Sequence, residues 1–365
     1  MNLLEPEAPG HCPADALSAR PGSKQVGLFG IFGTGNFGND GSLEAMVIAL
    51  RKVAPREPLL CICTGPQGVT RSLGLKAVPI YYQPSPDDGG RAVLLVKKAA
   101  GRAVMWLHAV RQLRRLKAII VPGMGALDDF GVSPLGWPLD LMTWFLLARL
   151  MGVKVVLASV GAGPIHHPLS RLFFKYAARA AHYRSYRDRI SHAYMAGIGL
   201  DVTQDPIVPD IAFSLPAPAS TSTGEAPLVV GVGVMTYYGW HKGPERVRGT
   251  YDGYIAKMTA YVDWLLGQGH RVRLLIGDET DNLAAEDILR ALRAKDAARA
   301  DTSIAFTPAS GLRDVMAQMA EIDVAVVTRF HNVVCALKMG KPAISIGYQD
   351  KNDVLLAEMG LADFC

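Results

Sequence analysis

The sequence predicts an α/β protein of two doubly wound, Rossmann-like domains that face each other across a cleft. Short apolar runs alternate with longer amphipathic runs along the chain, which is typical of parallel sheets covered by helices. A stretch rich in Pro, Ser and Thr near the middle has the composition of a linker. The 365 residues suffice for two such domains, each with its own core.

The short apolar runs give the predicted strands. In the first half they cover residues 26–32, 59–64, 118–121, 154–160 and 182–186. In the second half they cover residues 228–234, 271–276, 302–306, 323–327 and 343–346. We therefore expect an N-terminal domain over residues 25–213, a linker over 214–227 and a C-terminal domain over 228–365. Residues 1–24 mix Pro, Gly, Ala and acids without an apolar core, which indicates a disordered tail rather than a signal peptide.

Composition indicates a compact protein of a reducing compartment. Half of the residues (50%) are apolar and 19% are charged. Five cysteines, an odd number without paired spacing, argue against a disulfide framework. No apolar run approaches the roughly 20 residues that span a bilayer. We expect a cytoplasmic protein.

Positive charge is concentrated in residues 91–117. Eight Lys and Arg residues occur there without an acid, interspersed with apolar side chains that include Trp106. One interpretation is a basic amphipathic helix on an anionic membrane surface, which would place the protein at the inner face of the membrane. The other is a connecting helix packed on the sheet. A nucleic-acid partner is not expected, because the stretch has a single aromatic residue and matches no binding motif.

A glycine-rich segment follows the first predicted strand. Gly33, Gly35 and Gly38 fit a dinucleotide-binding pattern, but the second strand ends without the acid that would hold a ribose. A helical pattern begins near Ser42. We expect these glycines to let the backbone approach a different ligand, with Asn36 and Asp40 offering hydrogen bonds to hydroxyl groups.

Later loops add further polar candidates at strand ends. Asp128 ends a glycine-containing loop, and His166 and His167 end the next one. Arg187 follows the last strand of the first half, and Asp188 is expected to cap the helix after it. Arg187 at a helix N-terminus opposes the helix dipole unless it meets an anion. No Cys and His cluster has zinc-ligand spacing, so no metal is expected.

The end of the chain carries the most informative motif. Arg329 and His331 follow the predicted strand at 323–327, a helical run begins at His331, and Lys351 comes twenty residues later. Ligands bind at the carboxyl ends of parallel strands, and helix N-termini favour anions. Arg supplies a planar fork for carboxylate or phosphate, and His exchanges a proton near neutral pH. The motif therefore predicts a site for a small, multiply charged anion. The alternative is a structural role, in which Arg329 caps the helix and His331 is a half-buried core residue.

Taken in order, these segments resemble the polysaccharide pyruvyl transferase family. The resemblance rests on residues 33–40, 123–128, 160–164, 186–191, 209–213, 329–331, 340–348 and Lys351. It implies a fold similar to the glycosyltransferase B architecture, with the acceptor on the N-terminal domain and the donor on the C-terminal domain. The implied reaction transfers the enolpyruvyl unit of phosphoenolpyruvate to a sugar of a polysaccharide or lipid-linked glycan. It forms a pyruvate ketal and releases phosphate, with no cofactor beyond this donor.

The resemblance also implies roles for individual residues. Arg187, Arg329 and His331 match positions that surround phosphoenolpyruvate in the family, with Lys351 near the same end, and His166 or His167 matches a further histidine. A charged His331 could protonate the enol carbon while the cations hold the anionic groups. Asp40 and Asp128 are the candidates for the base that activates the sugar hydroxyl.

Two other functions stay open at this stage. A nucleotide-sugar-dependent glycosyltransferase of the same architecture would use Arg329 and Lys351 for a diphosphate. A non-catalytic binding protein related to the family would be expected to lack the Arg329 and His331 pair, which is present here.

Overall fold

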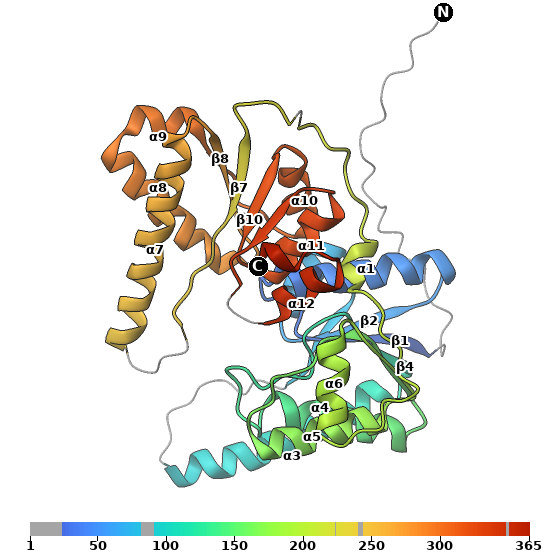
Figure 1. Ribbon diagram of the computed structural model, residues 1–365. Helices are drawn as coiled ribbons and strands as arrows, with labels where there is room; N and C mark the ends of the chain where they lie inside the picture. Colours follow the sequence, from blue (N-terminus) through green and yellow to red (C-terminus); the bar gives the residue numbers. More distant parts are fainter. Residues whose placement is uncertain (1–23, 82–90, 223, 240–243, 348–349) are drawn as a thin grey trace, which may run out of the picture.

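The computed structural model describes residues 24–81, 91–222, 224–239, 244–347 and 350–365. The chain forms two parallel sheets, each covered by helices, which lie one above the other in Figure 1. The predicted fold class is confirmed. The sheets fall on either side of the predicted linker, while the residue limits of the domains stay a prediction. The expected tail at residues 1–24 lies outside the described residues except for Lys24.

The N-terminal sheet has six strands in the order β3-β2-β1-β4-β5-β6, and every pairing is parallel. The order reverses at β1, so the carboxyl ends of β1 and β4 open a crevice where ligands commonly bind. Its strands are β1 (Gln25–Gly30), β2 (Leu59–Cys63), β3 (Ala77–Pro79), β4 (Leu116–Pro122), β5 (Lys154–Val160) and β6 (Tyr183–Tyr186). Its helices are α1 (Phe37–Val53), α2 (Pro66–Leu73), α3 (Arg91–Leu113), α4 (Trp137–Leu150), α5 (Pro168–Ala180) and α6 (Arg189–Gly197).

The C-terminal sheet has five parallel strands in the order β11-β10-β7-β8-β9. Its strands are β7 (Val229–Gly233), β8 (Arg271–Leu275), β9 (Ile304–Phe306), β10 (Val324–Val327) and β11 (Ala343–Ser345). Its helices are α7 (Pro244–Gly267), α8 (Asn282–Lys295), α9 (Ala297–Ser303), α10 (Leu312–Ala320), α11 (Phe330–Lys338) and α12 (Asp350–Glu358). Short 3-10 turns lie at η1 (Ile211–Ser214), η2 (Glu279–Asp281) and η3 (Ala362–Phe364).

All ten predicted strands occur, with shifted ends. The first strand ends at Gly30 rather than at residue 32, and residues 302 and 303 belong to α9 instead of β9. Strand β3 was not predicted, because three residues on the sheet edge carry too little apolar pattern to stand out. Among the described residues no helix is long and apolar enough to cross a membrane.

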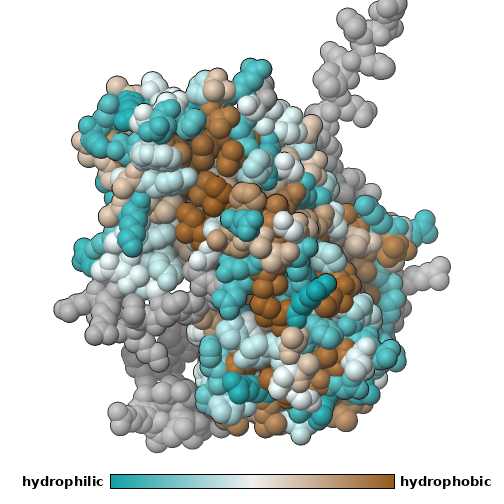
Figure 2. All heavy atoms as spheres, in the orientation of Figure 1, coloured by the Kyte–Doolittle hydropathy of each residue, from teal (hydrophilic) through white to brown (hydrophobic). Residues whose placement is uncertain are grey.

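The two halves of the molecule are packed against each other through α1 and α12. Helix α1 contacts η1, α10 and α11, and its residues Phe37 and Ala45 are buried within the core of the C-terminal half. Helix α12 contacts α6, where the Glu358 carboxylate accepts the Arg189 backbone N–H at 3.1 Å. Figure 2 shows hydrophobic side chains reaching the surface around this junction. The two carboxyl edges are therefore held facing each other.

The glycine segment behaves differently from the prediction. Helix α1 begins at Phe37 rather than near Ser42, because the Asn36 side chain caps it by accepting the Asn39 N–H. Gly38 and Gly41 therefore lie inside the helix. A Cβ on Gly38 would stand 1.9 Å from His331 Nδ1, and one on Gly41 would stand 2.4 Å from Leu312 Cδ1. These glycines admit the C-terminal half of the protein itself rather than a ligand.

The predicted linker is attached to the C-terminal half by hydrogen bonds. The Thr221 and Ser222 backbone N–H groups donate to the Ala320 carbonyl. The buried Lys341 ammonium donates to the Ser220 and Ser222 hydroxyls. A composition typical of a flexible linker therefore forms an ordered strap here.

Candidate active site

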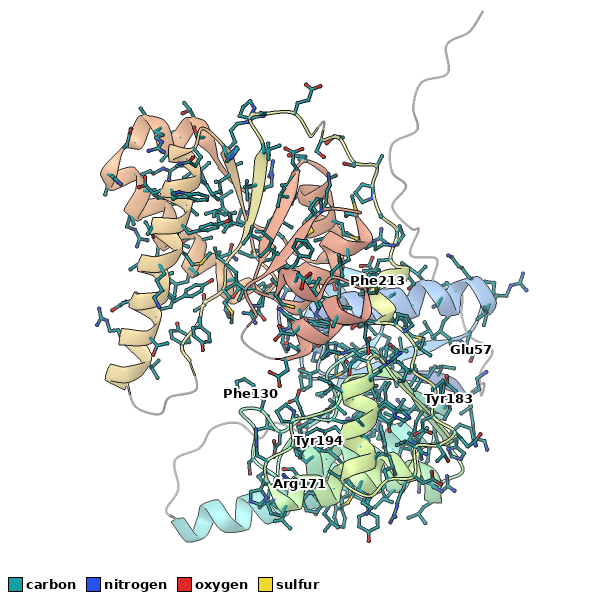
Figure 3. All side chains as sticks on the ribbon, in the orientation of Figure 1. Glu57, Phe130, Arg171, Tyr183, Tyr194 and Phe213 are labelled. Atoms are coloured by element: carbon teal, nitrogen blue, oxygen red, sulfur yellow. The ribbon has the colours of Figure 1, made fainter. Side chains whose placement is uncertain are left out.

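A cavity of about 630 Å³ lies where the carboxyl edges of the two sheets meet. Loops after β4, β5 and β6 line it from the N-terminal half, and the starts of α11 and α12 line it from the C-terminal half. Figure 3 shows Phe130 on the edge of the N-terminal half that faces the C-terminal half, with Tyr194 on α6 behind it. The predicted cleft is thus present, and its lining includes Asn36, Asp128, His166, Arg187, Arg329, His331 and Lys351.

Three helices present their N-terminal turns to this cavity. Asp188 caps α6 as expected, with Oδ1 accepting the Ser191 N–H at 2.6 Å. Arg329 precedes α11 and makes no side-chain cap, and Lys351 lies in the first turn of α12. Helix N-termini carry partial positive charge and unpaired N–H groups. Their convergence gives the cavity a field that favours an anion.

Arg187 is held by a buried carboxylate. Its Nη1 donates to Asp210 Oδ2 at 3.2 Å, and its guanidinium lies 4.3 Å from the centroid of the Phe330 ring. Its Nε is buried and makes no hydrogen bond within the part of the chain that the structure describes. Its contact there is an ion pair with Asp188 Oδ2 at 3.4 Å, so a ligand oxygen could complete its hydrogen bonding. The side chain also fills the space over Gly161, where a Cβ would lie 2.8 Å from the guanidinium.

His331 lies beside the same carboxylate. Its Nε2 is 3.7 Å from Asp210 Oδ2, an ion-pair distance rather than a hydrogen bond, and finds no hydrogen-bond partner in the described chain. Burial lowers the pKa of His331; Asp210 opposes this effect, and the charges of Arg187 and Lys351 add to it. The protein alone therefore disfavours the charged His331 that the resemblance implied.

Lys351 and Asp128 both line the cavity. Burial, followed by the like charge of Arg187, lowers the pKa of Lys351 to about 8. Burial raises the pKa of Asp128 despite the Phe130 N–H and the charges of Lys351 and Arg187. Asp128 is thus a carboxyl group of the cavity lining with a raised proton affinity.

Arg329 makes a bidentate ion pair. Its Nε and Nη2 donate to the two carboxylate oxygens of Asp281 at 3.0 and 2.6 Å. Asp281 is fully buried and also accepts the backbone N–H of Thr236 at 2.9 Å. This pair fixes the direction of the guanidinium, which remains part of the cavity lining.

Of the other predicted site residues, some line the cavity and some do not. Asn36 lines the cavity while its Nδ2 donates to Asp278 Oδ2 at 3.2 Å across the two halves. His166 also lines the cavity. His167 is outside the lining and caps α5, with its Nδ1 accepting the Leu169 N–H at 3.1 Å. Asp40 is outside the lining as well: its Oδ1 accepts the Gly33 N–H at 2.6 Å, and burial raises its pKa to about 6.

The sequence analysis did not predict three residues of the site. Asp210 and Asp281 lie behind the two arginines, and Phe330 lies between Arg187 and the Lys351 ammonium, which is 5.9 Å from the ring centroid. Asp210 and Phe330 each fall within segments that the sequence had already singled out. Nothing in the sequence indicates the pairing of Asp281 with Arg329, because the two are 48 residues apart. Among the described residues no group of three or more His, Cys, Asp or Glu side chains could hold a metal ion.

The partners of Asp210, rather than its burial, decide the direction of its pKa shift. Burial alone raises the pKa, but His331, Arg187 and the Ala212 N–H outweigh that effect and leave the pKa below its ordinary value. Asp210 is therefore a buried anion that contacts one cation and one titratable ring. The arrangement couples the position of Arg187 to the protonation of His331.

Comparison with known proteins gives one family and one fold. A family model described as "Polysaccharide pyruvyl transferase" matches residues 36–350. No curated protein sequence matches the chain at a significant level.

Several solved structures share the architecture. UDP-GlcNAc 2-epimerase from Methanocaldococcus jannaschii is 11% identical with a TM-score of 0.57, covering 93% of this chain and 87% of its own. A putative UDP-N-acetylglucosamine 2-epimerase from Listeria monocytogenes is 10% identical with a TM-score of 0.57, covering 90% and 80%. MurG from Acinetobacter baumannii is 13% identical with a TM-score of 0.52, covering 92% and 83%. At these identities the similarity shows the fold alone, which is of the glycosyltransferase B type.

Proposed function

The chain belongs to the polysaccharide pyruvyl transferase family, and from this premise we propose that it transfers the enolpyruvyl unit of phosphoenolpyruvate to a sugar. The proposed acceptor is a hydroxyl of a polysaccharide or lipid-linked glycan, and the proposed product is a pyruvate ketal.

One observation carries the choice of donor. Arg187, His331 and Lys351 lie close together in the cavity. Burial lowers the pKa of both His331 and Lys351, and the positive charge of their neighbours lowers it further. Two buried donors in this group, Arg187 Nε and His331 Nε2, make no hydrogen bond among the described residues. A ligand with both a carboxylate and a phosphate would relieve the repulsion and supply the missing acceptors. Phosphoenolpyruvate has this combination.

The proposed reaction begins with proton transfer. Binding of the anion raises the pKa of His331, which then protonates the methylene carbon of phosphoenolpyruvate while the carbon–carbon double bond opens. The neighbouring carbon becomes an electrophilic, oxocarbenium-like centre. Arg187, Arg329 and Lys351 stabilise the carboxylate and phosphate around it.

Addition of the sugar completes the transfer. Asp128 accepts the proton of an acceptor hydroxyl as its oxygen bonds to the electrophilic carbon. Phosphate then leaves with its bridging oxygen, and a neighbouring hydroxyl bonds to the same carbon and gives its proton to the departing phosphate, which closes the ketal. We favour Asp128 over Asp40 as the base, because Asp128 lines the cavity and Asp40 does not.

Titration calorimetry tests the donor against the competing function, a nucleotide-sugar-dependent glycosyltransferase. We expect phosphoenolpyruvate to bind in the presence of EDTA. At pH 8 binding should be accompanied by proton uptake, because an anion raises the pKa of Lys351 from about 8 and that of His331 from its lowered value. Comparison of buffers with different ionisation enthalpies measures that uptake.

The same titrations can also contradict the proposed donor. Binding of UDP-GlcNAc without binding of phosphoenolpyruvate would replace the proposal with the glycosyltransferase. Arg187→Lys keeps the charge but removes the planar fork, so it should weaken phosphoenolpyruvate binding by about tenfold, equivalent to loss of one charged hydrogen bond.

A further inference from the structure

The helices on one side of the N-terminal half are unusually poor in acids. Helices α3, α4 and α5 pack side by side, as Figure 1 shows, and Asp140 is their single acidic residue. Asp140 is buried and paired with Arg102. We call the outer surface of these three helices, with the loop that leads into α4, the α3–α5 face.

Exposed cations remain on this face. Arg111 lies in α3, and Arg114 and Arg115 come directly after the end of this helix. Arg171 and Arg179 are exposed on α5. None of these five makes an ion pair within the described residues. The face therefore carries positive charge that the described chain does not neutralise.

Large apolar side chains are exposed between these cations. Trp106 is 54% exposed and Leu107 is 71% exposed on α3, and Leu150 at the end of α4 is 83% exposed. On α5, Leu172 and Tyr176 are exposed as well. Helix α3 packs inward through Met105, Ala109 and Leu113, so one side of it is a packed helix and the other side is exposed.

The C-terminal half provides an internal comparison. Its outer helices α7, α8 and α9 also expose cations, and several of these are paired: Lys295 with Asp263, Arg290 with Asp287 and Arg293 with Asp301. Lys257 of α7 makes no ion pair among the described residues. Pairing of exposed cations with nearby acids is thus common in this helical layer, whereas the five Arg residues of the α3–α5 face make no such pair.

We propose that the α3–α5 face binds the surface of an anionic lipid bilayer. Unpaired Arg residues attract acidic headgroups, and Trp and Leu side chains enter the boundary between headgroups and acyl chains. The contact is peripheral. It does not depend on the identity of the reaction in the cleft.

The exposed apolar surface continues from this face to the cavity. The loop between β4 and α4 exposes Phe130, Val132 and Leu135, and Phe130 also lines the cavity. Arg102 of α3 donates to the Leu135 carbonyl, which ties this loop to the basic helix. A bilayer on the α3–α5 face would therefore lie close to the entrance of the cleft.

Vesicle binding of the full chain tests the proposal. Co-sedimentation with phosphatidylglycerol vesicles is expected at low salt, with weaker binding as the Debye length shrinks from about 10 Å at 0.1 M to about 3 Å at 1 M salt. Phosphatidylcholine vesicles should bind far less. Arg111→Glu/Arg115→Glu should weaken binding by roughly 30-fold or more, the factor for two interfacial cations. The matched control Arg248→Glu/Lys257→Glu reverses two exposed cations of α7 and should bind as the unaltered protein does.

Tryptophan fluorescence locates the contact. Brominated phosphatidylglycerol should quench the protein, and Trp106→Phe should lose most of that quenching. Trp264→Phe is the control, because Trp264 is 56% exposed on α7, close to the 54% of Trp106. Absence of binding at low salt, or equal loss in the α3 and α7 variants, would overturn the proposal. So would a dimer in light scattering that Trp106→Ala converts to a monomer, because the face would then bind a second copy.

Discussion

The two arginines of the cleft are each held by a buried carboxylate that is not part of the cavity lining. Asp210 contacts Arg187 and His331, and Asp281 holds Arg329 through both of its oxygens. Removal of such a carboxylate leaves a buried cation without its partner, which costs more than the pair contributes. Asp210 and Asp281 therefore serve mainly to position the charged side chains of the cleft.

Replacement of Asp210 should change the pKa of His331. Asp210 raises the pKa of His331 against the effect of burial, so Asp210→Asn should lower that pKa further. If His331 must be protonated to donate, the pH above which kcat/KM declines should shift downward in Asp210→Asn. Phosphate release from phosphoenolpyruvate, measured across pH with a competent acceptor, checks the shift.

His331→Gln is the companion variant. It keeps a hydrogen-bond donor but cannot deliver a proton, so turnover should fall by about two to four orders of magnitude while phosphoenolpyruvate binding changes little. An unshifted profile in Asp210→Asn together with near-normal turnover in His331→Gln would show that another residue protonates the substrate.

At the scale of elements, α1 acts as the contact between the two halves of the molecule. Gly38 brings α1 against His331, and Gly41 brings it against Leu312. The sequence analysis expected the glycines to let the backbone approach a ligand, whereas at Gly38 and Gly41 the approaching group is the protein's own C-terminal half. Contacts between residues nearly 300 positions apart leave no local pattern in a single sequence.

Gly38→Ala tests that contact. The added Cβ cannot stand 1.9 Å from His331 Nδ1, so the ring or the helix must move. We expect a loss of about 1–3 kcal/mol in the free energy of unfolding, the usual cost of overpacking, together with reduced turnover. Thermal unfolding and phosphate release measure the two effects.

Gly253→Ala is the matched control on α7. A Cβ there meets nothing within 4 Å, so it should stabilise the protein by about 0.5–1 kcal/mol through helix propensity alone. Equal stability changes in the two variants would mean that Gly38 is not a packing requirement.

At the scale of the whole molecule, alternation of apolar and amphipathic runs was enough to predict two parallel sheets and a cleft. Arg187, Arg329, His331 and Lys351 were placed together correctly, because each follows a strand end or begins a helix on the same edge. His167 and Asp40 follow strand ends too, but their side chains make local backbone contacts instead. Strand ends thus predict the neighbourhood of a residue, while side-chain direction depends on contacts that the sequence does not display.

A crystal structure of the complex with phosphoenolpyruvate would show whether these residues hold it. We expect the ligand in the cavity between the two halves, with an anionic oxygen accepting from Arg187 Nε and His331 beside the methylene carbon. A crystal in which phosphoenolpyruvate leaves Arg187 and His331 untouched, or in which the cavity holds a UDP-sugar in its place, would contradict this expectation.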